Sequence, residues 1–412
     1  MGAEITEIKG GVASAAGFRA ASCAAGIKYQ GRTDMAMVAC DVPCVAAGTF
    51  TSNRVKAACV QWDMNIVRSG KGNLQCIVVN SGIANACTGQ EGFDACRITA
   101  EAAAKELNIS PESVAVASTG VIGMQLPVDK LAAGVIHMSC VLEHSREAGT
   151  AASKAIMTTD TINKEIAVEF EIGGKKVTLG GMSKGSGMIH PNMCTMLGFL
   201  TTDLNIEKSL LQEALSSVVK DTFNMITVDG DTSTNDTLLI MADGLADNPA
   251  ICEKGADYDL FYKALFHVCR YLARTMAGDG EGASKLFEAR VTGARNEDDA
   301  RTLAKAIVGS NLSKAAIFGC DANFGRFLCA MGYSGADFDQ NDVEMFFESC
   351  GGKIQVFDRG QPLDFDEELA VQILKQKEVM VIADMHEGDA QATAFGCDLT
   401  YDYVKINADY RS

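Results

Sequence analysis

Positive charge is scarce in this sequence. Its 412 residues include 36 Lys and Arg against 53 Asp and Glu, which gives a formal net charge of -17 at pH 7. The basic residues are dispersed, and no run of them is longer than the pair Lys175-Lys176. Because nucleic acids and anionic membranes bind clustered Lys and Arg, this balance excludes both as the main expected partner.

Long apolar runs, linkers and repeats are missing as well. No apolar segment approaches the roughly 20 residues that a transmembrane helix needs. The N-terminal segment contains Glu4 and Glu7 and has no apolar core of the signal-peptide type. The chain has only six prolines, no low-complexity linker and no solenoid repeat, and its length favours a globular protein of two or three domains or two interleaved lobes.

The fifteen cysteines form no recognisable framework. Their number is odd, and residues such as Cys76, Cys269 and Cys329 stand in apolar segments. Cys40 and Cys44 are the closest pair with metal-like spacing, but no second pair or histidine cluster completes a zinc site. We interpret the cysteines as reduced, small apolar residues and expect no disulfide and no bound metal, which indicates a cytoplasmic location.

Hydrophobic periodicity predicts a mixture of helices and strands. A helical period occurs over 93–107, 206–223, 258–276, 298–307 and 367–377. Short apolar runs predict strands over 75–80, 166–170, 237–241, 315–318 and 378–383. Asn205 and Asp298 are candidate helix caps. Because the elements do not alternate strictly, we expect an α+β fold in which layered sheets are covered by helices.

The segment 181–203, near the middle of the chain, is the most informative. It combines a cluster of glycines with Lys184, Pro191 and a threonine, Thr195, that opens an apolar run. Clustered glycines indicate tight backbone geometry or the close approach of a ligand. If the chain were cut before Thr195, this residue would carry a hydroxyl nucleophile and a free α-amine able to act as a base near neutral pH.

Two patterns in the same segment suggest other nucleophiles. Gly181–Gly185 fits the G-x-S-x-G nucleophile elbow, but that motif requires a helix directly afterwards, which the glycines and Pro191 disfavour. Cys194 and His190 are four residues apart, and the intervening Pro191 disfavours a helix that would place them on one face. We therefore favour an accidental match for the first pattern and a small buried cysteine for the second.

Polar segments elsewhere have a structural and a functional interpretation. Ser118–Gly123 is typical of a strand that runs into a turn, and Thr119 with Gly120 is suited to donate hydrogen bonds to an oxyanion. The clusters Met157–Thr161 and Asp229–Asp236 are typical of hydrogen-bonded turns, and the second lacks the spacing of a calcium loop.

The glycine-rich stretch Gly278–Lys285 is a further candidate. It lacks the spacing of a phosphate loop, and the carboxylate of Glu281 would repel phosphate. A carboxylate in a glycine turn suits a substrate that carries an amine better.

The stretch from Lys184 to Leu197 closely resembles the self-cleavage segment of the ornithine acetyltransferases, the ArgJ-type glutamate N-acetyltransferases of arginine biosynthesis. Further segments resemble signatures of this family in the same order. They are Gly17–Ala20, Asn80–Ala86, Ser118–Gly123, Met157–Thr161, Val228–Asp236, Asp279–Ala283 and Ile406–Ala408. The resemblance spans nearly the whole chain.

The resemblance implies self-cleavage between Cys194 and Thr195. An α chain, 1–194, and a β chain, 195–412, would stay associated as a heterotetramer of two α and two β chains, with an αββα sandwich fold. Most relatives have alanine where this chain has Cys194, and cysteine is also small. His190 stands where a small residue is usual, and we assign it no role.

The resemblance also implies the chemistry and the site residues. Thr195 would transfer the acetyl group of N-acetylornithine to glutamate, with Thr119 and Gly120 as the oxyanion hole and no cofactor or metal. Some relatives also use acetyl-CoA as donor, and no residue here decides that question. The residues expected to bind substrate are Thr158, Lys184, Thr195, Glu281, Asn407 and Ser412.

Plainer interpretations of some of these residues exist. Without the resemblance, Lys184 would be taken for a solvated surface lysine and Ser412 for a frayed chain end. Asn80, Asn85 and Asp236 are candidates for residues that brace the site from behind.

Two rival functions remain open. One is a self-processing aminopeptidase or amidohydrolase of the DmpA type, which would hydrolyse rather than transfer. The other is an unprocessed binding protein without catalysis. Acceptor use distinguishes the first rival, and the mass of the purified chain distinguishes the second.

Overall fold

The computed structural model describes residues 4–69, 73–190 and 196–409. The chain forms two compact units, and each is assembled from separate stretches of sequence. Unit 1 comprises Met1–Gly185, Pro191–Lys220 and Thr232–Leu272, and unit 2 comprises Ser186–His190, Asp221–Asp231 and Ala273–Ser412. Two interleaved lobes, one of the expected arrangements, describe this organisation.

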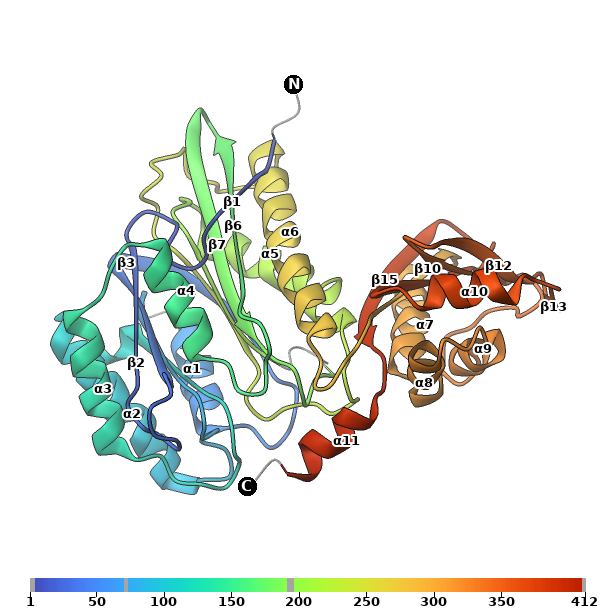
Figure 1. Cartoon of the computed structure of the whole chain (residues 1–412). Helices are drawn as coiled ribbons and strands as arrows, with labels where there is room; N and C mark the ends of the chain where they lie inside the picture. The colour runs from blue at the N-terminus through green and yellow to red at the C-terminus, as the bar shows by residue number, and fades with distance from the viewer. Residues whose placement is uncertain (1–3, 70–72, 191–195, 410–412) are drawn as a thin grey trace. The chain divides into compact units, whose positions relative to one another are not determined.

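Unit 1 is built on a sheet of nine strands within the described residues (Figure 1). Eight of them follow the order β1-β6-β7-β8-β9-β3-β4-β5, and β2 pairs with β3. The pairs β8–β9 and β4–β5 are parallel and the others are antiparallel. Their bounds are β1 Thr6–Ile8, β2 Phe18–Cys23, β3 Met35–Phe50, β4 Leu74–Asn80, β5 Val114–Ser118, β6 Lys164–Ile172, β7 Lys175–Lys184, β8 Leu197–Thr202 and β9 Thr237–Ala242.

The long strand β3 joins two halves of this sheet. Its first part pairs with β2 and β4, and its last part, from Val45 to Phe50, pairs with β9. The register with β4 shifts between Ala39 and Cys44, and an irregularity of this kind bends a strand. Strand β3 therefore belongs to both halves of the sheet.

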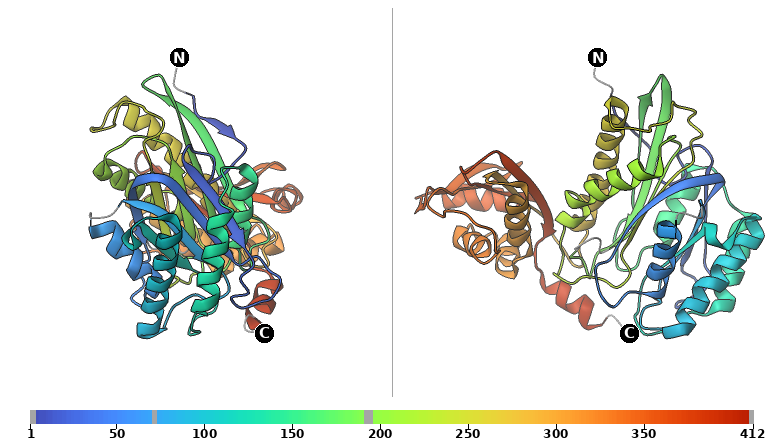
Figure 2. Two further views of the ribbon diagram at one scale, coloured as in Figure 1. Left: turned by 90° about the vertical axis from the view of Figure 1, so that its left-hand side faces the viewer. Right: turned by 180° about the vertical axis from the view of Figure 1, so that it is seen from behind.

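Helices cover both sides of the sheet. The helices α1 (Ala58–Ser69), α2 (Gly89–Leu107) and α3 (Val128–Cys140) lie on one side, and α5 (Lys208–Lys220) and α6 (Ala256–Gly278) lie on the other (Figures 1 and 2). Helix α4 (Arg146–Ala155) packs on β2 and β3.

One apolar core of unit 1 includes residues from both halves of the sheet. Met37 of β3 and Phe199 of β8 are fully buried members of this core, together with residues of α1 to α4. Burial of such side chains is the main favourable term in folding. The layers confirm the predicted α+β fold, in which sheets are covered by helices.

Unit 2 has a six-stranded sheet in the order β13-β12-β11-β14-β10-β15, counted over the described residues. Only the pair β10–β14 is parallel in that sheet. The strands are β10 Leu286–Ala294, β11 Glu344–Ser349, β12 Gly352–Asp358, β13 Gln361–Pro362, β14 Glu378–Asp384 and β15 Ala390–Cys397. The helices are α7 Glu297–Gly309, α8 Asn311–Gly319, α9 Phe324–Gly332, α10 Glu367–Leu374 and α11 Tyr401–Ala408.

The core of unit 2 is separate from that of unit 1. It gathers Phe287, Phe327 and Phe347 with apolar residues of α7 to α10. Helix α11 contributes nothing to it, since none of its residues is buried. Within the described part of the chain, we find no helix that combines the length and the apolar character needed to cross a membrane.

Most of the predicted elements are confirmed. The five predicted helices correspond to α2, α5, α6, α7 and α10, and four of the five predicted strands correspond to β4, β6, β9 and β14. Cys76 and Cys269 are buried, as expected of small apolar residues, whereas Cys329 is exposed.

The predicted strand over 315–318 is wrong, because these residues lie within α8. The Ser310 side chain caps this helix by accepting a hydrogen bond from the Ser313 amide, and Cys320 ends it in the left-handed conformation. A four-residue apolar run does not distinguish a buried strand from a buried helical turn. The two predicted caps are also wrong: α5 begins only at Lys208, so Asn205 does not directly precede it, and Asn296 rather than Asp298 caps α7.

Candidate functional site

The turn after β5 holds the two predicted oxyanion residues. The Thr119 amide donates to the Asn80 carbonyl at 3.0 Å. Gly120 has a φ of +129°, and a Cβ there would lie 2.3 Å from the Gly82 carbonyl carbon. Only glycine fits this position, because the backbone conformation and the close approach both exclude a side chain. The glycine at position 120 therefore allows the turn to pack directly against the backbone of the loop that follows β4.

Two asparagines brace the Thr119 turn from behind. The Asn80 Oδ1 accepts from the Ser118 hydroxyl at 2.7 Å, which supports its predicted role. Asn235 was not predicted, although its Nδ2 donates to the Ser118 carbonyl at 2.8 Å and also to the Ala84 carbonyl. Asn85 instead holds the start of α2, because its Nδ2 donates to the Gly92 carbonyl.

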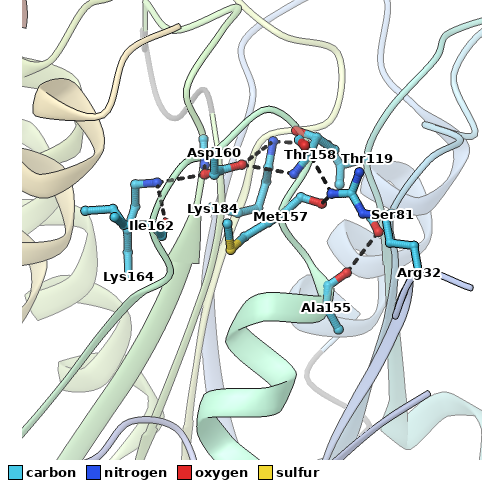
Figure 3. Close-up of polar contacts among 11 residues, drawn as sticks. Arg32, Ser81, Thr119, Ala155, Met157, Thr158, Asp160, Ile162, Lys164 and Lys184 are labelled. Atoms are coloured by element: carbon cyan, nitrogen blue, oxygen red, sulfur yellow. Dashed lines mark hydrogen bonds and ion pairs between the residues drawn. The ribbon is translucent and has the colours of Figure 1, made fainter. Parts of the chain in front are cut away.

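Lys184 lies at the end of β7, and its side chain is only 9% exposed. Its ammonium group lies 3.4 Å from the Thr119 hydroxyl and 3.9 Å from Asp160 Oδ2 (Figure 3). The interpretation as a solvated surface lysine is therefore wrong. A buried ammonium beside a hydroxyl can attract and orient the carboxylate of a substrate.

Thr158 stands in the loop between α4 and β6. Its amide donates to Asp160 Oδ2 at 3.0 Å, and its carbonyl accepts from Arg32 Nη2 at 3.0 Å. Figure 3 shows this loop beside Lys184 and Thr119. Three of the predicted substrate and oxyanion residues, Thr119, Thr158 and Lys184, thus gather in unit 1.

Asp236 is a buried carboxylate just before β9. Burial raises the pKa of its carboxyl well above the usual range, although hydrogen bonds from Ser233, Thr51 and the Met196 amide oppose the shift. The amide of the next residue donates to the Met196 carbonyl at 2.9 Å, so this part of the chain lies against the start of β8. Its predicted bracing role remains a prediction.

Three predicted residues lie outside the described residues. They are the cleavage pair, Cys194 and Thr195, and the C-terminal Ser412. Consequently, neither the thiol–imidazole pairing considered for Cys194 nor the nucleophile role of Thr195 is tested here.

Unit 2 holds the remaining predicted substrate residues. The Asn407 Nδ2 of α11 donates to Glu281 Oε2 at 2.8 Å, and Glu281 is only 6% exposed. The Glu281 amide donates to the Ser186 carbonyl at 2.8 Å, which ties it to the glycine-rich segment before the proposed cleavage point. The position of the Glu281 carboxylate depends on Gly187, because a Cβ there would lie 2.4 Å from Oε2.

Asp229 holds the next residues of the same segment and was missed as a site residue. Its carboxylate accepts from the amides of Met188 at 2.6 Å and Ile189 at 2.8 Å. It also accepts from the Tyr403 hydroxyl of α11 at 3.3 Å. Sequence patterns gave no signal for this role, since they identify Asp229 only as one member of a polar turn.

His190 has a defined partner in unit 2. Its Nδ1 lies 3.0 Å from the Thr227 hydroxyl oxygen. The pKa of the imidazole is lowered to about 4, mainly by burial and also by the ammonium of Lys305, while Asp229 opposes the shift. The ring is therefore neutral at pH 7.

The nucleophile-elbow interpretation finds no support. Ser183 is fully buried within β7, and no helix occurs in the described residues that follow it up to His190. An elbow requires an exposed hydroxyl at a sharp turn between a strand and a helix. Among the described residues, moreover, no three His, Cys, Asp or Glu side chains are grouped to hold a metal ion.

These groups define a class of protein. Unit 1 provides a hydroxyl, a glycine turn and a buried ammonium, and unit 2 provides a buried carboxylate held by an amide. Hydroxyl and amide donors can stabilise the oxyanion of acyl transfer, and a buried ammonium or carboxylate can bind a group of opposite charge. Both features are typical of enzymes that act on acyl groups of small charged substrates.

Comparisons with known proteins identify the family. The family model described as ArgJ family matches residues 19–412. The arginine biosynthesis bifunctional protein ArgJ of Symbiobacterium thermophilum is 52% identical over 407 residues, which cover 98% of this chain and 99% of that protein. The protein of the same name from Bacillus subtilis is 44% identical over 99% of this chain and 98% of its own length.

A crystal structure of the arginine biosynthesis bifunctional protein ArgJ from Bacillus halodurans was also found, with 47% identity and a TM-score of 0.48. The matched region covers 50% of this chain and 96% of the chain in that crystal structure. On the family match and the two relatives, the chain belongs to the ArgJ family.

Proposed function

We propose that the chain cleaves itself between Cys194 and Thr195, giving an α chain, 1–194, and a β chain, 195–412. Thr195 Oγ attacks the Cys194 carbonyl, the acyl group shifts from nitrogen to oxygen, and water hydrolyses the resulting ester. The break frees the α-amine of Thr195, which then serves as the base for its own hydroxyl. Hydrogen bonds to the backbone of residues 185, 188 and 189 support this proposal, because they hold the segment before the break in one geometry.

We further propose acetyl transfer from N-acetylornithine to glutamate in arginine biosynthesis. Thr195 Oγ attacks the acetyl carbonyl, and Thr119 and Gly120 stabilise the oxyanion. The amide bond breaks and the ornithine amine leaves with a proton. The amine of glutamate then attacks the acetyl-threonine ester, which gives N-acetylglutamate and restores the hydroxyl. This ping-pong sequence requires no cofactor and no metal.

Charge complementarity assigns roles to the remaining residues. Lys184 pairs with a substrate carboxylate and Glu281 with a substrate ammonium. Thr158, Asn407 and Ser412 complete the binding site. The observation that carries the proposal is the buried Lys184 ammonium 3.4 Å from the Thr119 hydroxyl, since it joins a carboxylate-binding group to an oxyanion-stabilising one.

The test combines fragment analysis with acceptor dependence. Purified protein should yield two fragments by intact mass, the second beginning with Thr195, and should form acetylglutamate from acetylornithine and glutamate. Thr195→Ala should abolish both cleavage and transfer, whereas Cys194→Ala should retain both. A single intact chain that still transfers acetyl groups would refute the proposal.

A second donor is favoured by the name of the relatives, which are called bifunctional. We propose that acetyl-CoA also acetylates Thr195, so that glutamate is acetylated without acetylornithine. The measurement is thiol release from acetyl-CoA in the presence of glutamate. If no thiol is released by a protein that is active with acetylornithine, the chain is monofunctional.

We also propose a heterotetramer of two α and two β chains, in the cytoplasm. Buried cysteines that act as small apolar residues, such as Cys76 and Cys269, suit a reducing compartment. The rival function, hydrolysis by a DmpA-type aminopeptidase, predicts free acetate without acetylglutamate in the same assay.

A further inference from the structure

Asp160 is a buried carboxylate to which the reaction outlined above assigns no role. Its side chain has no exposed surface. Asp160 Oδ1 accepts from Lys164 Nζ at 2.8 Å and from the Gly185 amide at 2.7 Å. Asp160 Oδ2 accepts from the Thr158 amide at 3.0 Å and lies 3.9 Å from Lys184 Nζ. Figure 3 shows the carboxylate between the two lysine side chains.

The two oxygens of Asp160 connect the segments that carry predicted substrate residues. One contact reaches the backbone of Thr158, one reaches the Lys184 side chain, and one reaches the amide of Gly185, the first residue of the glycine-rich segment. A carboxylate that only balanced the buried charges of Lys164 and Lys184 would need no contact with a backbone amide. The two amide contacts hold the backbone at Thr158 and Gly185, and the Lys184 contact links a third part of the site to the same carboxylate.

Electrostatics keeps this carboxylate ionised. Burial alone would raise the pKa of the Asp160 carboxyl, but the ammonium groups of Lys184 and Lys164 and the Thr158 amide hold the pKa well below its usual range. Lys164 has no exposed side-chain surface and also donates to the Ile162 carbonyl at 3.2 Å. A buried charge is tolerated only when it is paired and hydrogen-bonded, so Lys164 makes a charged Asp160 possible at this place.

Arg32 fixes the outer side of the same loop. Its Nη2 donates to the carbonyls of Met157 at 2.7 Å and Thr158 at 3.0 Å. The Thr158 backbone is therefore held by Asp160 at its amide and by Arg32 at its carbonyl. Both contacts act on the backbone of Thr158, so they do not depend on the Thr158 side chain.

We infer that Asp160 is a positioning residue for acetyl transfer, which holds Thr158, Lys184 and Gly185 in the relative places that the reaction needs, with Lys164 as its buried counter-charge. The inference rests on the proposed function for its effect on catalysis. The contacts of Asp160 with the backbone do not depend on the proposed function, and amide exchange tests them separately.

The experiment compares four proteins for kcat and KM with acetylornithine, fragment formation, and amide exchange of peptides that cover residues 184–186. They are the natural chain, Asp160→Asn, the double variant Asp160→Asn/Lys164→Met, and Asp203→Asn. Asp203 is the matched control, because this buried carboxylate of unit 1 also accepts two backbone amides, from Thr178 at 2.7 Å and Ala16 at 3.2 Å.

The double variant separates positioning from folding. Removing both charges of the Asp160–Lys164 pair leaves no unpaired buried ion of that pair, and such replacements are often neutral for stability. We expect both Asp160 variants to lose about tenfold to a hundredfold in kcat/KM, as removal of charged hydrogen bonds does, and to exchange the Gly185 amide faster. Asp203→Asn should change thermal stability but leave kcat/KM within about twofold.

Two results would overturn the inference. The first is a folded double variant with natural kcat/KM, which would reduce Asp160 to a partner for Lys164. The second is unchanged exchange of the Gly185 amide in the Asp160 variants. A natural chain that transfers no acetyl group refutes the proposed function instead, and the exchange comparison still decides whether Asp160 holds the backbone.

Discussion

Gly187 lies directly beside the Glu281 carboxylate, and a Cβ added there would come within 2.4 Å of it. Gly187→Ala must therefore displace the Glu281 side chain from its hydrogen bond with Asn407. We expect KM for acetylornithine to rise by about tenfold, the usual effect of losing one charged hydrogen bond, with little change in thermal stability.

The control for Gly187→Ala is Gly332→Ala, because an added Cβ at Gly332 meets open space. This variant should retain the natural KM. Equal KM values for all three proteins would show that the carboxylate of Glu281 does not bind the substrate.

His190 makes a pH-dependent contribution to stability. Its pKa is about 4 in the folded chain and near 6.5 ordinarily, so between these values the unfolded chain binds a proton that the folded chain does not. The imidazole therefore favours folding above pH 6.5, and this contribution is lost as the pH falls from 6.5 to 4. Comparison of His190→Gln with the natural chain by urea unfolding at several pH values isolates the effect.

The difference in unfolding free energy between the natural chain and His190→Gln should shrink as the pH falls through that window. A difference that does not depend on pH would mean that the histidine titrates normally in the folded protein.

For single residues, the sequence predicts the chemical role of a side chain better than its place in the fold. The turn at Thr119 and Gly120 could be predicted, because a glycine after a strand indicates a special backbone conformation. The burial of Lys184 and the pairing of Asp160 with Lys164 could not, since they depend on how a loop and two strands meet. Local patterns identify Asp160 only as a polar turn residue.

Helix α11 is an element whose role in substrate binding can be separated from folding. None of its residues is buried, and Tyr401 is 85% exposed. Asn407 nevertheless donates a hydrogen bond to the Glu281 carboxylate, and Tyr403 donates one to the Asp229 carboxylate. A chain that ends at Thr400 should keep its melting temperature within a few degrees, because little apolar surface is lost. It should nevertheless lose most of its kcat/KM for acetylornithine.

Calorimetry and steady-state kinetics on the truncated chain test this separation. Full activity would remove Asn407 from the binding site. A large drop in melting temperature would instead assign α11 a role in stability that its exposure does not indicate.

Elements were predictable where a period or a run was long enough. The 23-residue α6 is amphipathic over several turns, and its period is unambiguous. The run in α8 spans about one helical turn and was misassigned for that reason. Its Ser310 cap and the left-handed Cys320 are the features that decide for a helix.

Each of the two units contains residues from both proposed fragments. Strands β7 and β8 lie on either side of the proposed break and pair with each other. Leu179 is opposite Thr202 at one end of the pairing, and Lys184 is opposite Leu197 at the other. Strand β3 likewise pairs with β9, so two strands of the second fragment lie between strands of the first. Unit 2 in turn takes Ser186–His190 from the first fragment.

Neither fragment contains a complete unit, and we therefore expect neither to fold alone. Residues 1–194 and 195–412, produced separately, should show no cooperative unfolding transition, whereas the processed full-length protein should show one. Circular dichroism during heating provides the measurement. A cooperative transition in either isolated fragment would contradict this prediction.

The choice of partner for each strand is the part of the fold that sequence patterns do not reveal. The pairing of β3 with β9 joins segments that are far apart along the chain, and no local period encodes which strands become neighbours. Composition and length indicate only that the chain is large enough for more than one core.

The pairing of β3 with β9 also has a consequence for the time at which the protein matures. During translation β3 leaves the ribosome long before β9 has been synthesised, so the sheet that contains both stays incomplete until residues 237–242 emerge. If the break before residue 195 depends on that finished sheet, it happens only after most of the second fragment has been made. Both fragments then arise from one nascent molecule in equal amounts, and no cell would need to match their synthesis.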